Sequence, residues 1–385
     1  MKISIRTLAR GAVAMALGTG LAAAAFAADL KVGLSVSLSG PNSSLGVPYA
    51  KGMQAALAYK PEVNGHKIQL IVLDDGSDPT TAGRNARKLV EEDKVDVLMG
   101  TSGVPAAIAM AQVARDAKVP MIGLTPIQLD PAENPWVFTV AQPTQLMVDA
   151  VVQRMKKDGV KTVGYIGFSD AWGDLVYDAL MKAAPGAGIQ VLGNERYARS
   201  DQSVTGQILK LMAMHPDAVM TGGAGTPGAL PYLALSERGF KGPVYGQHGL
   251  INPDFVRVVG AAGQGAQMPT GPVIVAEQLP DGYPTKKIAL DFRAIFQKVN
   301  NAPTSDAFSA YSFDAWLVFA DAAARAKGEP GTPEFRLSLR DAIASTKEVV
   351  GTHGVYNFKP GNLYGVDERA RVIVKLDNGQ WKLAP

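Results

Sequence analysis

Two hydroxyl residues at the ends of predicted strands are the best-placed groups in this chain for binding a small anion. Ser102 lies in the loop Gly100–Gly103, between an apolar strand and an amphipathic helix. We expect Ser102 to be the N-cap of that helix, whose free N–H groups and dipole favour negative charge nearby. Thr125 ends the next strand, at the carboxyl edge where open α/β sheets bind ligands. The pattern predicts a protein that holds a small acid.

Residues arranged for catalysis or metal binding are sparse. The sequence has no P-loop, no GxGxxG after its first strand, no GxSxG, no HExxH and no Cys. Its four histidines show no metal-ligand spacing: His66, His215, His248 and His353. We interpret Asp74-Asp75 as turn and N-cap residues, and Gly222–Gly225 as a close backbone approach without the lysine of a nucleotide site. We therefore predict no catalytic residue, no metal and no cofactor.

The elements that must position the two hydroxyls alternate between apolar strands and amphipathic helices. Strands are predicted at Leu30–Ser37, Lys67–Leu73, Val95–Met99, Pro120–Leu124 and Trp136–Ala141, with helices at Pro48–Tyr59, Thr80–Glu92 and Pro105–Ala117. After residue 143 the alternation restarts, with strands Thr162–Phe168, Ile189–Leu192, Asp217–Gly222 and Pro243–Gln247. This rhythm is typical of parallel sheets covered by helices on both faces. We predict an α/β fold with two doubly wound, Rossmann-like lobes, since the chain is too long for one core.

The last third of the chain predicts how the lobes connect. Three helices, Pro284–Val299, Ser305–Ala326 and Pro333–Ser345, precede two antiparallel strands, Gly354–Phe358 and Ala370–Leu376. We expect the helices to return to the first lobe and the strands to join the second. The chain then crosses near residues 143, 272 and 352, which gives lobes of residues 28–143 plus 273–352 and 144–272 plus 353–385. Such a three-stranded hinge would make a closing cleft.

The N-terminus has the pattern of a secretory signal peptide. Three basic residues precede a short apolar run, Gly11–Ala25, and Ala25-Phe26-Ala27 matches an A-x-A cleavage site. We predict that residues 1–27 are removed by cleavage near Ala27; an uncleaved anchor is the alternative. Of 38 Lys and Arg, three lie in this segment, which leaves 35 against 35 Asp and Glu. A nearly neutral chain offers no basic field for nucleic acid or anionic lipid.

Four loops at carboxyl ends of strands are expected to converge on the cleft: residues 39–46, 100–103 with 124–127, 169–173, and 222–225 with 246–249. Trp172 is the aromatic residue of the third loop. It either packs against the helix that follows or forms an apolar wall for a ligand.

Seven segments carry a resemblance to a known family: LSGPNSSLG (38–46), VLMGTSGVPAAIAMAQVARDAKVPMI (97–122), FTVAQP (138–143), DAWGD (170–174), AVMTGGAG (218–225), GFKGPVYGQHG (239–249) and GVDERARVIVKLDNGQWKL (365–383). Their order and spacing resemble the type I periplasmic solute-binding proteins of ABC importers, in the leucine/isoleucine/valine-binding family. The resemblance covers essentially the whole chain after residue 27. It implies two lobes that close on a ligand in the periplasm.

The resemblance also implies roles for individual residues. The family holds the ligand carboxylate with a hydroxyl and backbone N–H groups of the first lobe, which correspond here to Ser102 with Gly103, Thr125 and the backbone near Ile127. An aromatic residue of the second lobe commonly closes over the ligand, and Trp172 occupies that place where a Tyr is usual.

Three positions depart from the amino-acid binders. A further Tyr of the family falls at Ala224, the acid that pairs with the α-ammonium falls at His248, and the Trp that walls the leucine pocket falls at Leu45. An unpaired ammonium in a closed cleft costs several kcal/mol. We therefore expect an apolar or aromatic carboxylate without an α-amino group, such as an aryl-carboxylate, aryl-propenoate or 2-keto acid, with His248 hydrogen-bonded to its second polar group.

The predicted function is capture of such an acid by lobe closure, as the monomeric periplasmic component of an ABC importer with an inner-membrane permease as partner. Three alternatives stay open at this point. An amino acid is the ligand if Asp170, Glu277 or another cleft acid pairs with its ammonium. The chain could also be a sensing module that reports to a receptor. An enzyme would need a nucleophile or an acid–base pair at the loop ends, where none is found.

Overall fold

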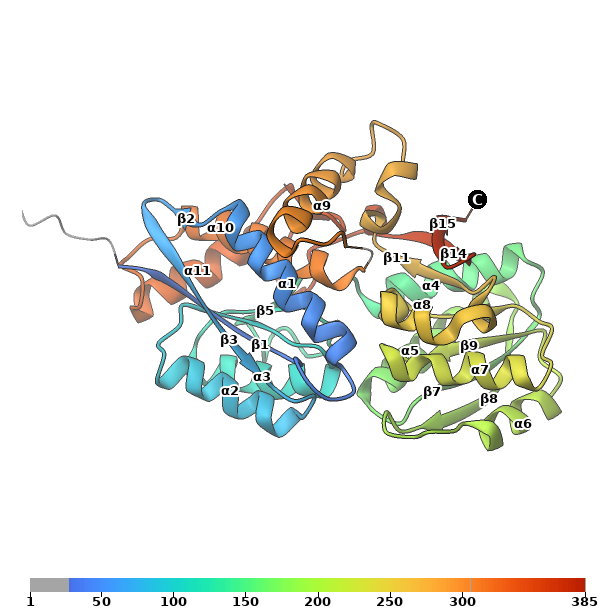
Figure 1. Cartoon of the computed structure of the whole chain (residues 1–385). Coiled ribbons are helices and arrows are strands. Elements are labelled where there is room, and N and C mark those ends of the chain that lie inside the picture. The colour runs from blue at the N-terminus through green and yellow to red at the C-terminus, as the bar shows by residue number, and fades with distance from the viewer. Residues whose placement is uncertain (1–27, 305, 385) are drawn as a thin grey trace, which may run out of the picture.

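The computed structural model describes residues 28–304 and 306–384, and it has two α/β lobes (Figure 1). The first lobe contains a sheet of strand order β2-β3-β1-β4-β5-β6. Its strands are β1 (Leu30–Val36), β2 (Glu62–Val63), β3 (His66–Asp74), β4 (Val97–Gly100), β5 (Met121–Gly123) and β6 (Val137–Thr139). All neighbours are parallel except β2 and β3, which form an antiparallel hairpin.

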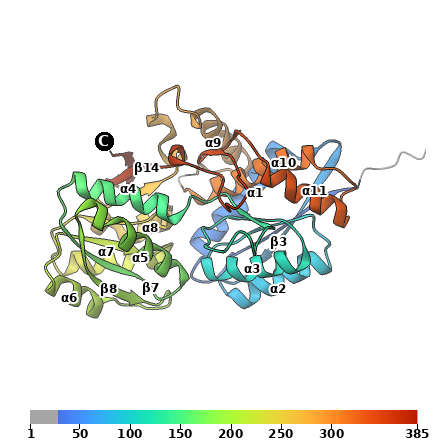
Figure 2. The same ribbon diagram turned by 180° about the vertical axis from the view of Figure 1, so that it is seen from behind.

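Helices cover both faces of this sheet, as the alternating pattern predicts (Figure 1 and, from behind, Figure 2). On one face lie α2 (Pro79–Glu91) and α3 (Val104–Ala117); on the other lie α1 (Ser43–Tyr59) and α10 (Phe308–Arg325), flanked by α9 (Lys286–Asn300) and α11 (Pro333–Ala344). Helix α1 packs closely on α10 because Gly52 has no Cβ: one placed there would lie 2.0 Å from the Ser309 carbonyl oxygen. The C-terminal helices thus belong to the first lobe.

The second lobe contains a sheet of strand order β15-β14-β11-β10-β9-β7-β8. Its strands are β7 (Thr162–Phe168), β8 (Gln190–Tyr197), β9 (Ala218–Gly222), β10 (Val244–Tyr245), β11 (Gln267–Thr270), β14 (Val372–Asp377) and β15 (Gln380–Leu383). In the order of the sheet, the neighbouring strands β8, β7, β9, β10 and β11 are parallel, and β14 and β15 add an antiparallel edge. The lobe also holds helices α4 (Thr144–Lys157), α5 (Ala171–Ala183), α6 (Thr205–Ala213), α7 (Leu230–Glu237) and α8 (Pro253–Val259).

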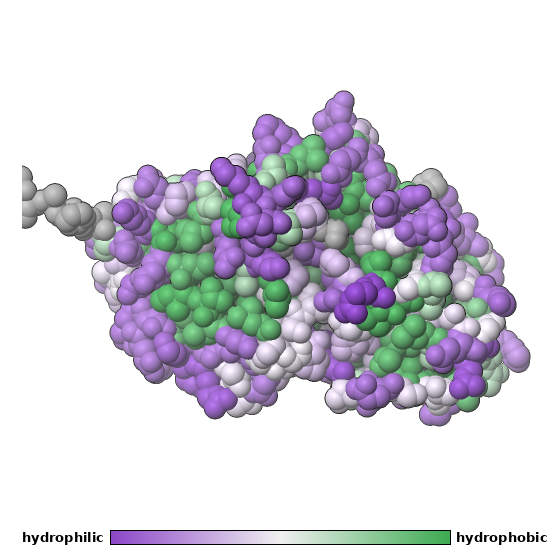
Figure 3. Space-filling model, viewed as in Figure 1, coloured by the Kyte–Doolittle hydropathy of each residue, from purple (hydrophilic) through white to green (hydrophobic). Residues whose placement is uncertain are grey.

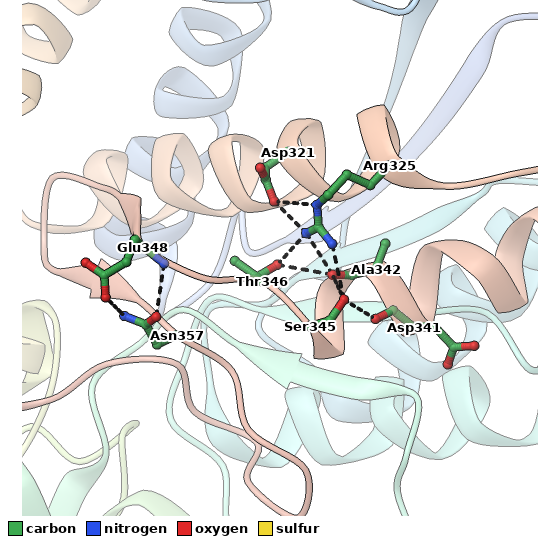
Figure 4. Close-up of polar contacts among 8 residues, drawn as sticks. All are labelled: Asp321, Arg325, Asp341, Ala342, Ser345, Thr346, Glu348 and Asn357. Carbon is green, nitrogen blue, oxygen red and sulfur yellow. Dashed lines mark hydrogen bonds and ion pairs between the residues drawn. The ribbon is translucent and has the colours of Figure 1, made fainter.

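Short elements complete the chain. Six single-turn or slightly longer 3₁₀ helices are η1 (Pro185–Ala187), η2 (Thr226–Ala229), η3 (His248–Leu250), η4 (Gly260–Gly263), η5 (Pro272–Gln278) and η6 (Glu368–Ala370) within the described residues. Strands β12 (Val349–Val350) and β13 (Val355–Tyr356) form a small antiparallel hairpin. Across it, the side chain of Asn357 hydrogen-bonds Glu348 twice (Figure 4).

Arg325, near the end of α10, fastens α11 to α10 (Figure 4). Its guanidinium donates to the Ala342 carbonyl at 2.8 Å, to Ser345 Oγ at 3.1 Å and to Thr346 Oγ1 at 3.2 Å, all at the C-terminal end of α11. A cation beside the free carbonyls of a helix C-terminus satisfies them and opposes the helix dipole.

The two predicted tail strands do not pair with each other, which corrects that expectation. β13 pairs with β12, and β14 pairs with β11 and β15. The chain after β13 stays on the first lobe, where the ring of Phe358 meets Phe138 edge-on at 5.5 Å. The sequence did not indicate β11, because Pro269 lies within it and proline is rare inside sheets.

Three segments of the described chain connect the lobes, and the first of them contacts the third. Gln142 follows β6, and its side chain donates to the Ala370 carbonyl, which precedes β14, at 2.9 Å. Gly271 follows β11 and packs against the imidazole of His353, where a Cβ would lie 1.8 Å from Nδ1. We propose that the last crossing lies between Tyr364 and β14, later than the position near 352, and the lobe boundaries stay a prediction.

The predicted signal peptide, residues 1–27, lies outside the described residues. Among those described, no helix is long and apolar enough to cross a membrane. Figure 3 shows separate apolar areas on each lobe among hydrophilic ones, a mixed surface of the kind usual for globular proteins.

Candidate functional site

One cavity lies between the lobes, at the carboxyl ends of their parallel strands. It holds about 400 Å³ of space free of protein atoms, part of it open to solvent. Its first-lobe wall is Leu45, Tyr49, Ser102, Gly103, Val104, Leu124, Thr125, Pro126, Ala141, Phe308 and Tyr311, and its second-lobe wall is Trp172, Arg199, Ala224, His248 and Gly249. Seven of the eight residues predicted from the sequence line this cavity.

Ser102 presents its hydroxyl at the N-terminus of α3, but it is not the N-cap. The N-cap is Gly103, without a side-chain hydrogen bond, so that expectation was wrong by one residue. The Ser102 Oγ instead accepts a hydrogen bond from the Ser37 N–H at 3.0 Å. Its own hydroxyl proton is therefore available for donation, beside the first N–H groups of α3, which have no partner within the helix.

Asp75 fixes the position of the loop that contains Ser102. Its fully buried carboxylate accepts hydrogen bonds from Ser37 Oγ at 2.6 Å, from the Ser77 N–H at 2.9 Å and from Thr101 Oγ1. Ser37 is itself the hydrogen-bond partner of Ser102, and Thr101 is its neighbour in the chain, so the carboxylate fixes the end of the strand and the loop together. The interpretation of Asp75 as a turn residue therefore missed its second role, as a support of the loop that carries Ser102.

The middle of the cavity is aromatic. Tyr49, Phe308 and Tyr311 approach from α1 and α10, and the Tyr49 and Phe308 rings meet edge-on at 5.5 Å. The hydroxyl of Tyr49 donates to the Leu124 carbonyl at 2.7 Å, which leaves mainly the ring for a ligand. Opposite them, Trp172 at the start of α5 donates its indole N–H to the Gly223 carbonyl at 3.2 Å. These rings form an apolar slot.

His248 closes the second-lobe side as a neutral imidazole. It is 3 % exposed, and burial lowers its pKa to about 4. Its ring meets Trp172 edge-on with centroids 5.5 Å apart, and its Nδ1 atom has no hydrogen-bond partner. A buried nitrogen without a partner costs free energy, so a ligand group that hydrogen-bonds it gains affinity.

No acidic side chain is among the described residues that line the cavity. Asp170 lies nearby, but one oxygen accepts from the Trp172 and Gly173 N–H groups and the other pairs with Arg199 at 2.6 Å. Glu277 pairs with Arg293 away from this cavity. Both carboxylates are therefore already paired with an arginine of the protein.

Ile127 is the one predicted residue that the structure does not bring to this cavity. It lines a different hollow, between its loop and α5, and its backbone N–H and carbonyl both hydrogen-bond the Tyr364 hydroxyl, at 3.1 and 2.7 Å. Its N–H is therefore engaged within the protein.

Comparisons with known proteins agree with this architecture. The model of the periplasmic binding protein family matches residues 29–361, so the chain belongs to that family. A solved extracellular ligand-binding receptor from Rhodopseudomonas palustris is 40% identical, with a TM-score of 0.89 over 93% of this chain and 100% of that one. These findings confirm both the two-lobed α/β fold and the family resemblance.

Two further relatives differ in what their names say they bind. A Leu/Ile/Val-binding protein homolog of Brucella melitensis is 27% identical over 266 residues, 66% of this chain and 70% of the relative. A solute-binding protein of an ABC transporter from R. palustris, solved in complex with benzoate, is 21% identical with a TM-score of 0.76, over 92% of this chain and 95% of that one. Family members bind small molecules and work with ABC permeases, and the relatives are receptors, not enzymes.

The sequence did not point to Arg199 or to the aromatic residues of α1 and α10. Arg199 follows β8, which runs to Tyr197 instead of ending at the predicted Leu192, so the residue was not recognised as lying at a strand end. Helix α10 is buried nearly all round, which gives no sign of which rings face a ligand.

Proposed function

We propose that this protein is the periplasmic substrate-binding component of an ABC importer and that it captures a small hydrophobic or aromatic carboxylate, an aryl acid or a 2-keto acid. The observation that carries the proposal is the division of one cavity. Hydroxyls and a helix N-terminus lie on the first-lobe side, and the second-lobe side offers a neutral His248 with no acid.

The first-lobe side suits a carboxylate. Ser102 and Thr125 supply hydroxyl donors, and the N–H groups at the start of α3 supply a positive end of a helix dipole. The aromatic slot fits a flat or branched apolar body. His248 then hydrogen-bonds a carbonyl, a hydroxyl or a second carboxylate of the ligand.

Matched ligand pairs test the proposal. Phenylpyruvate and phenylalanine differ only in a keto group against an α-ammonium, and so do 4-methyl-2-oxopentanoate and leucine. We expect the keto acids, benzoate or cinnamate to raise the melting temperature, and calorimetry to give the amino acid of each pair at least a hundredfold weaker affinity, because its ammonium finds no carboxylate. Stabilisation by amino acids alone would overturn the assignment.

Binding of a branched-chain amino acid is the second candidate, and the names of curated relatives favour it. It requires a carboxylate within reach of the ammonium, which means that Asp170 leaves Arg199. The Asp170→Asn variant separates the two candidates: it abolishes amino-acid binding if Asp170 pairs with the ammonium and leaves keto-acid binding measurable. Permease and ATPase genes beside this one would favour transport over sensing.

A further inference from the structure

Arg199 lines the cavity, and a cation in a site for acids is the expected partner of the ligand carboxylate. Its hydrogen bonds within the protein indicate a different role. Its Nε donates to Asp170 at 2.6 Å, and its Nη1 donates to the Asn42 side-chain oxygen at 2.8 Å. Its guanidinium also lies over the ring of Phe168, 4.1 Å from the centroid.

The Asn42 contact joins the two lobes. Asn42 precedes α1 in the first lobe, and Arg199 follows β8 in the second. Figure 1 shows that this end of α1 faces the second lobe. Within the second lobe, Arg199 is braced by Asp170, which also holds the N-terminus of α5 and therefore Trp172. Arg199 thus connects the aromatic wall of the site to the opposite lobe.

A second cross-lobe hydrogen bond lies close to the first. The Thr226 N–H donates to Ser44 Oγ at 3.2 Å. The backbone comes this near because Gly225 has no side chain: a Cβ there would lie 2.9 Å from Ser44 Oγ and 3.6 Å from Leu45. Both cross-lobe bonds therefore meet the start of α1, beside the cavity and without using the anion site.

We propose that Asn42, Ser44, Arg199 and Thr226 form an interlobe clasp, and that Arg199 is a positioning residue of this clasp and not the anchor of the ligand carboxylate. The clasp stabilises the closed arrangement and sets the affinity for every ligand by the same factor. Selectivity among the acids belongs to Trp172 and His248, whereas Ser102 binds the carboxylate that the acids share. The inference rests on the proposed function only in requiring that lobe closure encloses a ligand.

The Asn42→Ala and Ser44→Ala variants test the clasp. Each removes an acceptor that is used only when the lobes meet, which corresponds to about a three- to tenfold loss of affinity. We expect this same factor for benzoate, phenylpyruvate, 4-methyl-2-oxopentanoate and leucine, whichever of them the wild type binds. Asn194→Ala is the matched control, because Asn194 accepts from Arg196 at 2.6 Å within one lobe; its affinities stay at the wild-type value.

Arg199→Gln decides between clasp and anchor. As a clasp residue it is coupled to Asn42, so the double variant Asn42→Ala/Arg199→Gln loses less affinity than the product of the single losses. If Arg199 anchors the carboxylate, Arg199→Gln removes acid binding while Asn42→Ala changes nothing, and that result overturns the proposal. Small-angle scattering of the ligand-free protein gives a second readout: Asn42→Ala and Ser44→Ala shift the population toward a larger radius of gyration, and Asn194→Ala does not.

The two proposals fail in different ways. If only leucine binds, the aromatic-acid assignment is wrong, and the clasp is still judged by the leucine affinities. If none of the four probes binds, the scattering curves alone decide it, and unchanged curves for both variants reject the clasp. If acids bind as proposed but Asn42→Ala and Ser44→Ala affect different ligands unequally, the clasp is wrong and the proposed function stands.

Discussion

At the scale of single residues, the proposed site has two kinds of group: hydroxyl and N–H groups for the ligand carboxylate, and aromatic rings for its apolar body. The Ser102 Oγ accepts a hydrogen bond from the Ser37 N–H, so its own hydroxyl proton can be donated to a ligand. The hydroxyl of Tyr49 and the indole N–H of Trp172 already donate to carbonyl groups of the protein. The aromatic residues are therefore expected to contact a ligand mainly with the faces of their rings. The loss of binding affinity caused by substituting each residue should therefore differ between classes of ligand.

Ser102→Ala should weaken every carboxylate by a similar factor, about tenfold to a hundredfold, because a hydrogen bond to a charged group is worth about 1.5–3 kcal/mol. Calorimetric titration with benzoate, phenylpyruvate and 4-methyl-2-oxopentanoate measures the loss. Ser236→Ala, at an exposed position on α7, serves as the control. A loss confined to one of the three acids would show that Ser102 does not contact the shared carboxylate.

Trp172→Ala should act selectively. Removing the indole opens the slot opposite Tyr49 and Phe308, so aryl acids lose more affinity than branched aliphatic acids, by about a further tenfold. The ratio of the benzoate and 4-methyl-2-oxopentanoate affinities reports this directly. Equal losses for the two acids would mean that Trp172 acts only through the position of α5.

At the scale of elements, most strands and helices were predictable because each lobe repeats a strong alternation of apolar strands and amphipathic helices. The exceptions have physical causes. Strand β8 continues through the polar residues Asn194–Arg196 because it is an edge strand, half-buried and tolerant of them. Strand β11 contains Pro269. Arg199 was missed as a consequence of the first error, whereas Ser102 and Thr125 were found because their strands end where the apolar runs end.

Helix packing gives a prediction at the same scale. Gly52→Ala should destabilise the protein by about 1–3 kcal/mol, because the new Cβ would overlap the Ser309 carbonyl and push α1 from α10. Gly206→Ala is the matched control: it lies in α6 with no atom within 4 Å of the added Cβ, so its higher helix propensity makes it neutral or slightly stabilising. Chemical denaturation of both variants measures the difference. An unchanged midpoint for Gly52→Ala would contradict the tight contact.

At the scale of the whole molecule, buried titratable groups gather at the cleft and at the crossings between lobes. Burial lowers the pKa of His248 to about 4 and of His353 to about 3. The imidazole of His353 packs against the connecting residue Gly271 and stacks on Tyr311 of the cavity wall, 3.8 Å between centroids. Burial raises the pKa of Asp314 to about 6, although it accepts hydrogen bonds from the Thr352 and His353 N–H groups.

These shifts predict how stability depends on pH. The unfolded histidines gain protons below about pH 6.5 while the folded ones stay neutral, so the free energy of unfolding falls as the pH is lowered. Between pH 7 and pH 5 each contributes a loss of about 2 kcal/mol. Asp314 acts with the opposite sign: it takes up a proton in the folded state first and returns about 1.4 kcal/mol over the same window. The two histidines outweigh it, and the protein should be less stable at pH 5 than at pH 7.

Urea denaturation at pH 5 and pH 7 measures this difference. In His248→Gln the difference should shrink by about 2 kcal/mol, because the contribution of this histidine is gone. Asp314→Asn should enlarge the difference, because the opposing contribution is gone. If His248→Gln retains the full difference, the pKa of His248 is not lowered by folding, and the imidazole is protonated at pH 5 in the folded protein. A cationic His248 would then attract a second carboxylate at pH 5, which contradicts a buried imidazole that stays neutral in the site.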